Sequence, residues 1–383
     1  MKVTQLHTLI NAVTKEVLGE TAVVSEDLSN VVDIGKSIID SENGIDNYVR
    51  KLVNHIGKVV FVNRAYAGGV PSVLMDSWEF GSILEKISGE LPDAEENQSW
   101  NLQDGQEYKQ DVFHQPKVEA KFFNSKVTFE IPMSFTERQV KESFSSAEQL
   151  NGFVSMLTTN IENSMTVKLD SLIMRSINNM TGETLADGNA IRAVNLLTAY
   201  NAQAETPLTA AKAITNNDFV RFATYQIALV ADRMSKISKL FNVSGKARFT
   251  PADMRRVVLL SDFAKSSEIL TAAQTENADR VALPAHDAVP YWQGSGTGYS
   301  FADVSSIDVK TASGATVKKS GIIGVMFDRD AVGVANLDRR VTTNYNAKAE
   351  FYNNYYKMDA GYYNDLAENF VVFYVEDAPA GGK

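Results

Sequence analysis

The side chains that most often perform chemistry in proteins are scattered along this sequence. The chain has no cysteine, and none of its histidines lies in an H-E-x-x-H pattern. Structural and catalytic zinc sites need such ligands at short, fixed spacing. We therefore expect no metal centre, no disulfide and no thiolate nucleophile, and we interpret the four histidines as ordinary surface or core residues: His7, His55, His114 and His286.

Two short motifs resemble ligand-binding loops but lack essential parts. The segment GSGTG at 294–298 has neither the G-x-x-x-x-G-K-[ST] spacing of a phosphate-binding loop nor a strand-to-helix context. Asp328 and Asp330 resemble the start of a calcium loop, but the later acidic ligands are missing at the required offsets. The first motif predicts a loop and the second a turn after a strand. With no G-x-S-x-G elbow either, the sequence indicates neither an enzyme nor a cofactor.

The most regular pattern is a strand that leads into a long helix. In VTFEIPMSF at 127–135 apolar and polar residues alternate, and Pro132 cannot donate a ladder hydrogen bond, which predicts a half-buried strand at or near a sheet edge. Ser145 and Ser146 each precede an acceptor side chain by three residues, a helix-start signal, so we expect a helix of about thirty residues over 146–179. Its apolar stripe recurs at four-residue steps: Phe153, Leu157, Ile161, Met165, Leu169, Ile173 and Ile177. Each step turns about 40° around the axis, so different stretches of the helix should contact different elements or subunits.

An acidic segment interrupts the chain before this strand. Residues 76–115 contain ten acids against Lys86 and Lys109, a net charge of −8. A long loop with few apolar runs is most often functional or disordered, yet this one carries Trp78 and Trp100, which disordered segments seldom contain. We interpret it as a protruding hairpin that docks on a partner, and the alternative is a solvated loop with a hydrophobic cluster of its own.

Other periodic stretches complete a mixed α+β pattern. We expect helices over 45–56 and 217–241, and an N-terminal amphipathic helix rather than a secretion signal. Strands are expected at 58–62, 118–122, 256–261, 321–327 and 370–375, the last preceded by an aromatic-rich approach over 351–363.

Composition narrows the function further. The 383 residues are 44% hydrophobic and 22% charged, enough for two or three compact units. No apolar run approaches the roughly 20 residues of a membrane span. The net charge of −10 argues against a protein that binds nucleic acid or an anionic membrane surface.

The order of these parts resembles a known family. The run FEIPMSFTERQVKESFSSAEQLNGFVSMLTTNIENSMTVKLDSLI, the long loop before it, and the later GIIGVMFDRDAVGVAN and YYNDLAENFVVFYV are similar to the major capsid protein of tailed bacteriophages, which has the Hong Kong 97-like fold. The resemblance covers nearly the whole chain, and it depends on the ensemble of features rather than on one short signature.

The resemblance implies an α+β capsid fold with five parts. These are N-terminal helices and an arm (1–67), an extended loop (68–126), a peripheral domain with the spine helix (127–190), an axial domain (191–340) and a C-terminal return to the peripheral domain (341–383). Such a subunit assembles as pentamers and hexamers into the icosahedral head of a virion, in the bacterial host cytoplasm, and encloses double-stranded DNA without reading its sequence. Scaffolding, portal and decoration proteins are implied as possible separate partners, with no fused scaffold and no covalent cross-link expected.

Charge suggests where neighbouring copies meet. Residues 217–256 carry a net charge of +5, eight basic against three acidic residues, so we expect the acidic loop to lie over this segment of a neighbour, with the spine helix as the rival acceptor. The residues expected at inter-subunit contacts are Trp78, Glu90, Asp93, Glu95, Glu96, Trp100, Asp104, Lys168, Arg175, Arg233, Lys236 and Lys239. Two alternatives to a phage shell stay open: an encapsulin-like nanocompartment, and a soluble α+β enzyme.

Overall fold

The computed structural model describes Lys15, Ser37 and residues 73–75, 84–90, 92, 94, 96–108, 111, 113–136, 147–272, 283–293, 300–346, 348–349 and 351–378. The chain divides into two compact units, the first formed by Met1–Phe61 and Glu79–Phe123 and the second by Val62–Trp78 and Asn124–Lys383. Several sequence predictions lie outside the described residues. They are the N-terminal helix, the helix at 45–56, the strand at 58–62, the GSGTG loop, and Trp78, Asp93 and Glu95.

A four-stranded sheet forms one layer of the second unit. Its strand order is β1-β11-β12-β4, with bounds Leu74–Met75, Val332–Asn346, Phe351–Asn364 and Lys126–Thr136. Among the described strands β4 pairs with β12 alone, antiparallel, which confirms the predicted edge strand. Along β4 the apolar residues Val127, Phe129, Ile131 and Met133 pack against the core, and the residues between them are exposed. The alternating pattern therefore predicted correctly which side chains of β4 face the core and which face solvent.

A five-stranded sheet forms a second layer. Its order is β5-β13-β10-β6-β7, with bounds Ala193–Asn195, Phe370–Tyr374, Ile322–Asp328, Arg255–Leu260 and Asp287–Val289. The predicted strands at 256–261, 321–327 and 370–375 are thereby confirmed. All seven residues of β10 are buried, as expected for a central strand covered on both faces.

Shorter elements surround this sheet. They are α6 (Leu196–Asn201), α7 (Ala210–Ala213), α8 (Asn217–Met234), α9 (Ser261–Ala272), α10 (Phe301–Val304) and the hairpin of β8 (Ile307–Lys310) with β9 (Thr316–Lys319). The prediction that α8 continues to Phe241 is wrong. The Met234 carbonyl accepts a hydrogen bond from the amide of Thr250 at 2.7 Å, and the Ser238 amide donates to Arg248 at 2.9 Å. These long-range bonds replace the next helical turn.

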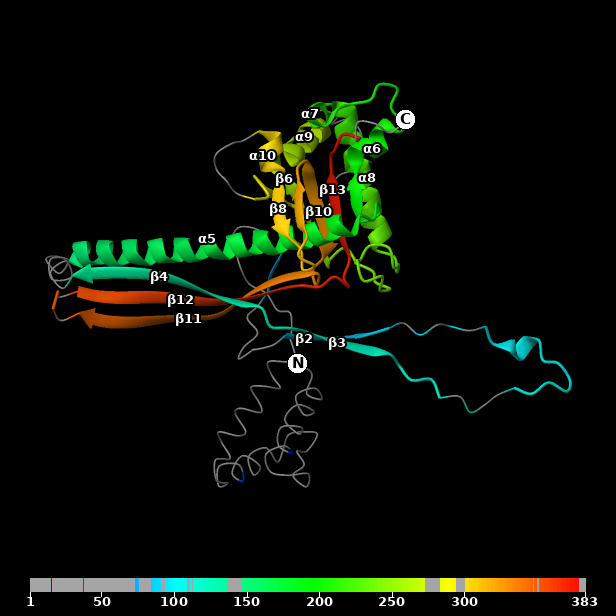
Figure 1. Ribbon diagram of the computed structural model, residues 1–383, viewed down its shortest axis with the longest axis horizontal. Helices are drawn as coiled ribbons and strands as arrows, with labels where there is room; N and C mark the ends of the chain where they lie inside the picture. The colour runs from blue at the N-terminus through cyan, green and yellow to red at the C-terminus, as the bar shows by residue number, and fades with distance from the viewer. Residues whose placement is uncertain are drawn as a thin grey trace. The chain divides into compact units, whose positions relative to one another are not determined.

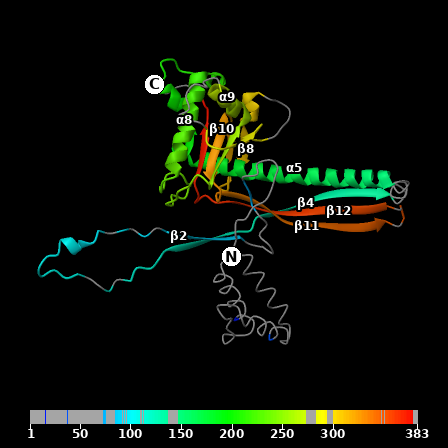
Figure 2. The same cartoon turned by 180° about the vertical axis from the view of Figure 1, so that it is seen from behind.

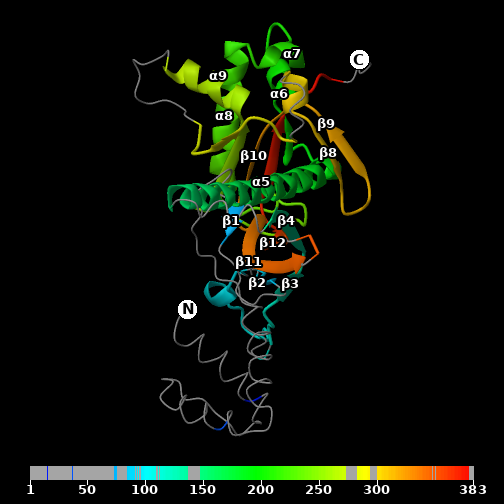
Figure 3. The same cartoon turned by 90° about the vertical axis from the view of Figure 1, so that its left-hand side faces the viewer.

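The long helix α5 spans Ala147–Asp187 and lies between the two layers (Figures 1 and 3). It contacts β4, β11 and β12 of the four-stranded sheet, and also β13 and the β8–β9 hairpin. This confirms that different stretches of the helix meet different elements. The helix is longer than predicted, because Thr181 and Thr184 are fully buried and donate hydrogen bonds to the carbonyls of Ile177 and Met180, so these polar residues do not end it.

Two hydrophobic clusters hold the second unit together. The larger one joins α5 to both sheets, with Leu169, Ile173 and Ile177 at its centre. The second lies between the five-stranded sheet and α8 with α9, and includes Phe219, Ile227 and Phe263. β10 contributes side chains to both clusters, because its successive side chains point to opposite faces of the sheet.

The described part of the first unit is a hairpin. β2 (Leu84–Gly89) pairs antiparallel with β3 (Val118–Phe123), and residues 90–117, called here the hairpin loop, join them. The described residues of the loop include a short 3-10 helix, η2 (Gln98–Trp100), visible as a cyan turn (Figure 2). The predicted hairpin is thus confirmed.

Candidate assembly surfaces

One face of the β2–β3 hairpin exposes apolar side chains. The strand register places Ile87 opposite Ala120, Glu85 opposite Phe122 and Gly89 opposite Val118. Directly opposed residues of an antiparallel pair lie on the same face, so Ile87, Val118 and Phe122 share it, and they are 64%, 64% and 59% exposed. An isolated two-stranded hairpin is only marginally stable in water. Such an uncovered apolar face is typical of a surface that binds a partner.

The hairpin loop adds larger exposed apolar groups. Trp100 is 94% exposed, Phe113 86% and Leu102 66%, so among the described residues the loop forms no hydrophobic cluster around them. Polar contacts hold the loop internally. The Ser99 amide donates to Asn97 Oδ1 at 2.8 Å, and the Gln103 amide donates to the Tyr108 hydroxyl at 3.0 Å. The acids of the loop that the structure describes are all exposed: Glu90, Glu96, Asp104, Glu107 and Asp111.

A second surface combines basic and apolar residues in the segment after α8. We call it the 233–249 surface, and it consists of Arg233, Lys236, Ile237, Lys239, Leu240 and Phe249. Ile237, Leu240 and Phe249 are 57%, 50% and 52% exposed, and the three cations are exposed as well. Among the described residues, none of these cations forms an ion pair. Ser238 and Arg248 form an antiparallel bridge, which sets Ile237 and Phe249 beside each other across it.

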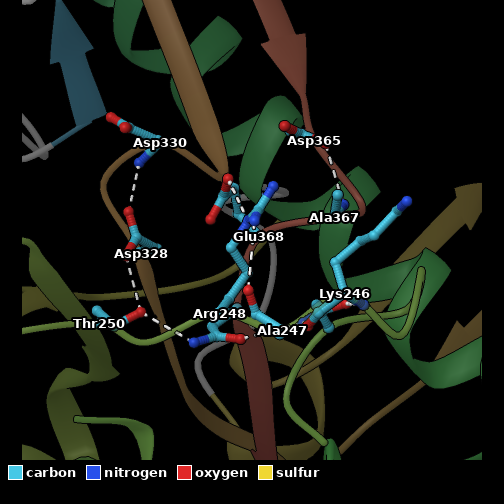
Figure 4. Close-up of polar contacts among 11 residues, drawn as sticks. Lys246, Ala247, Arg248, Thr250, Asp328, Asp330, Asp365, Ala367 and Glu368 are labelled. Carbon is cyan, nitrogen blue, oxygen red and sulfur yellow. Dashed lines mark hydrogen bonds and ion pairs between the residues drawn. The ribbon is translucent and has the colours of Figure 1, made fainter. Parts of the chain in front are cut away.

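A buried polar network supports this surface from beneath (Figure 4). Thr250 Oγ1 donates to Asp328 Oδ2 at 2.7 Å and accepts from Asn369 Nδ2 at 3.1 Å. Arg248 Nε donates to Glu368 Oε1 at 3.2 Å. Because satisfied buried networks are rigid, they fix the backbone that carries Phe249.

The same network joins two turns that connect the sheets. Asp328 ends β10, and its Oδ1 accepts the Asp330 amide at 3.0 Å, so the two aspartates shape a turn as predicted. The Asp365 amide donates to the Ala331 carbonyl, and the Asp328 amide donates to the Asn369 carbonyl, at 2.8 and 2.9 Å. The β10–β11 turn and the β12–β13 turn are therefore bonded to each other.

The two cations of α5 that the sequence analysis singled out, Lys168 and Arg175, are exposed. The Arg175 guanidinium lies 5.8 Å from the centre of the Tyr362 ring. Val167, 61% exposed, is the large apolar neighbour of Lys168 that α5 leaves in solvent. Within the part of α5 whose side chains are described, at 161 and 163–187, the exposed cations and large apolar groups are therefore sparser than on the 233–249 surface.

Burial raises the pKa of Asp328 above its ordinary value of 3.8, against the opposing hydrogen bonds from Asp330 and Thr250. The native state thus holds this proton more tightly than the unfolded chain. The resulting stability is fully present below pH 3.8 and is lost as pH rises through the raised pKa. We expect Asp328→Asn, which cannot ionise, to remove this fall in stability with pH. Urea unfolding of the unassembled protein at a series of pH values from about 3.5 to 7 measures it.

Asp359 supplies the opposite control. The hydrogen bond from Arg340 lowers the pKa of Asp359, so its stabilisation is present above the unfolded pKa and is lost as pH falls. Asp359→Asn should therefore remove a rise in the free energy of unfolding with pH, the opposite of the change expected for Asp328→Asn. If the free energy of unfolding varied with pH in the same way in wild type and in Asp328→Asn, the expectation for Asp328 would be contradicted.

In the described part of the chain, no group of three or more histidine, cysteine, aspartate or glutamate side chains could hold a metal ion. No helix in that part is long and apolar enough to cross a membrane. His114 is exposed in the hairpin loop, His286 lies with Nδ1 3.0 Å from the Pro284 carbonyl, and His7 and His55 fall outside the described residues.

Comparison with protein families identifies the chain. The model for Phi29-like phage major capsid protein matches residues 10–374, nearly the whole sequence. The chain belongs to this family. It is a capsid protein of a bacteriophage, a major head protein and a component of the virion. No curated protein matches it.

Several phage capsids are among the solved structures that resemble this capsid protein. A capsid structure of Cyanophage P-SCSP1u is 12% identical, covering 84% of this chain and 93% of that one, with a TM-score of 0.47. A capsid structure of Staphylococcus phage Andhra is 8% identical, covering 78% and 81%, also with a TM-score of 0.47. The mature capsid of bacteriophage PhiM1 is 7% identical, covering 84% and 91%, with a TM-score of 0.44.

Proposed function

We propose that this capsid protein assembles with itself, as pentamers and hexamers, into an icosahedral head shell around a double-stranded DNA genome. Membership of the major capsid family carries the proposal. The role is structural rather than catalytic, and assembly takes place in the bacterial host cytoplasm with separate scaffolding, portal and decoration proteins as partners. The shell encloses DNA without sequence-specific contacts, in keeping with a net charge of −10.

We further propose the Hong Kong 97-like arrangement for the fold. In it the spine helix is α5, the extended loop is 68–126, and the axial domain is 191–340 between the peripheral domain at 127–190 and the C-terminal return at 341–383. Residues 1–67 form the N-terminal helices and arm. The long α5 packed between two sheets supports this assignment.

Contacts between copies follow from the exposed groups. Glu90, Glu96, Trp100 and Asp104 of the hairpin loop face solvent in the single chain, and we propose that they contact a neighbouring copy, together with Trp78, Asp93 and Glu95. The acceptors are cations drawn from Lys168, Arg175, Arg233, Lys236 and Lys239, all exposed. A closed shell multiplies modest contacts, because each added subunit is held through several of them at once.

Electron microscopy of the purified, concentrated protein tests the proposal. We expect closed shells whose reconstruction resolves five-fold and six-fold rings of this chain, and light scattering should rise above a threshold protein concentration. Material that stays monomeric at every concentration, with and without a co-expressed scaffolding protein, would overturn the proposed function. Rings of a single order that never close into shells would overturn the icosahedral part.

A further inference from the structure

We infer that the hairpin loop of one copy docks on the 233–249 surface of a second copy. The inference rests on the proposed self-assembly and names the partner surface for the loop. The two surfaces are exposed in the chain, and each mixes large apolar side chains with an excess of one charge, negative on the hairpin loop and positive on the 233–249 surface. The juxtaposition of Trp100 and Phe113 with Ile237, Leu240 and Phe249 buries apolar area that both otherwise leave in water.

Charge complementarity selects this partner surface. The loop presents Glu96, Asp104, Glu107 and Asp111, all exposed. The acceptor presents Arg233, Lys236 and Lys239 within seven residues of sequence, none of them in an ion pair with the described residues. Opposite charges on facing surfaces steer the encounter and fix the register, whereas burial of the aromatic residues supplies most of the affinity.

The acceptor is already organised before docking. Arg192 donates to the Leu240 carbonyl at 3.1 Å, and the Phe370 amide donates to the Phe241 carbonyl at 2.8 Å. Arg248 and Thr250, which flank Phe249, are held by Glu368 and Asp328. A preorganised surface loses little conformational entropy on binding.

The spine helix fits the loop less well. It offers Lys168 and Arg175, but Arg175 already lies over the Tyr362 ring. Among the α5 side chains that the structure describes, at 161 and 163–187, Val167 is the exposed large apolar group that would receive the aromatic side chains of the loop. Matching both the charges and the apolar groups of the loop therefore favours the 233–249 surface.

Charge reversal with restoration tests the pairing. One variant carries Glu96→Lys, Asp104→Lys and Glu107→Lys, and a second carries Arg233→Glu, Lys236→Glu and Lys239→Glu. Each should raise the threshold concentration for shell formation at low salt by tenfold or more, and the six changes combined in one chain should restore it. The matched control combines the acid reversals with Lys168→Glu and Arg175→Glu, and this variant should stay impaired.

The outcomes separate two failures. Wild-type protein that never forms shells overturns the proposed function. Wild-type shells that form normally, with unchanged thresholds for both variants or restoration by the Lys168 and Arg175 control instead, overturn only the docking inference. Loss of bound nucleic acid by the Arg233, Lys236 and Lys239 variant without a change in assembly would also overturn it. Urea unfolding of each variant before assembly should match wild type, because every altered residue is exposed.

The absence of cysteine from the sequence allows a second readout that is independent of charge. In the variant with Asp104→Cys and Lys236→Cys, a flexible bismaleimide should link separate chains in assembled shells, and disassembled protein should yield little dimer. The pair Asp104→Cys with Lys168→Cys is the matched control. Preferential linking through position 168, or no linking at either pair within intact shells, would contradict the docking.

Discussion

Replacing Ile173 with alanine should lower the free energy of unfolding by about 2–5 kcal/mol. Ile173 has no exposed surface and lies in the cluster that joins α5 to both sheets. Removing its outer carbons costs their transfer free energy and leaves a cavity that two rigid sheets cannot collapse to fill. Urea unfolding of the unassembled protein, at a fixed protein concentration, measures the change in midpoint and slope.

Val167→Ala is the matched control on the same helix. Val167 is 61% exposed, and alanine has the higher helix propensity, so the free energy of unfolding should stay within about 0.5 kcal/mol of wild type. Equal losses in the two variants would contradict the placement of α5 between the layers. A loss confined to Ile173→Ala would support it.

Strong local patterns made part of this fold predictable from sequence. Alternation in β4 and the four-residue stripe of α5 each specify which side chains are buried, and the structure places Ile161, Leu169 and Ile177 inside. The extent of α5 was less predictable. Thr181 and Thr184 are unfavourable in an exposed helix, but their back-bonding to the helix is compatible with a buried site, which only the tertiary packing reveals.

The pairing of β11 with β12 was not predicted, because asparagine, lysine, aspartate and glycine interrupt the aromatic residues of β12. β12 reads FYNNYYKMDAGYYN, and among its described side chains the buried apolar ones are Met358, Ala360 and Tyr363. Its outer face is stabilised across strands instead. Lys357 pairs with Glu130 at 3.2 Å, and Arg340 forms an ion pair with Asp359. The available signal was the density of aromatic residues, which favour strands, in this segment.

Some features of the two candidate surfaces could likewise be predicted from the sequence, and others could not. The acidic excess of the hairpin loop and the basic excess of 217–256 are properties of composition, so they could be read without coordinates. The support beneath the 233–249 surface could not. Its bonds join residues that are distant in sequence, with Asn242 and Asn369 separated by 127 positions and Arg248 and Glu368 by 120.

A single methyl group at position 321 should be more damaging than most core truncations. Gly321 has φ of +82°, and a Cβ there would lie 2.0 Å from the Val375 carbonyl oxygen. Its own carbonyl accepts the Val375 amide at 2.8 Å, so the two backbones cannot separate without breaking the end of the β10–β13 pairing. We expect Gly321→Ala to lower the free energy of unfolding by more than about 4 kcal/mol, measured by urea unfolding and by the soluble fraction on expression.

Gly314→Ala separates the two causes of the loss at Gly321, which are the left-handed backbone conformation and the clash of the new Cβ with Val375. Gly314 has a similar φ of +88° in the β8–β9 turn, but a Cβ there meets nothing within 4 Å. This variant experiences only the cost of the left-handed backbone, about 1–2 kcal/mol. The excess loss in Gly321→Ala therefore reports the contact with Val375. Equal losses would mean that the start of β10 can shift away from β13, and that the five-stranded sheet is less tightly closed at this end than its hydrogen bonds indicate.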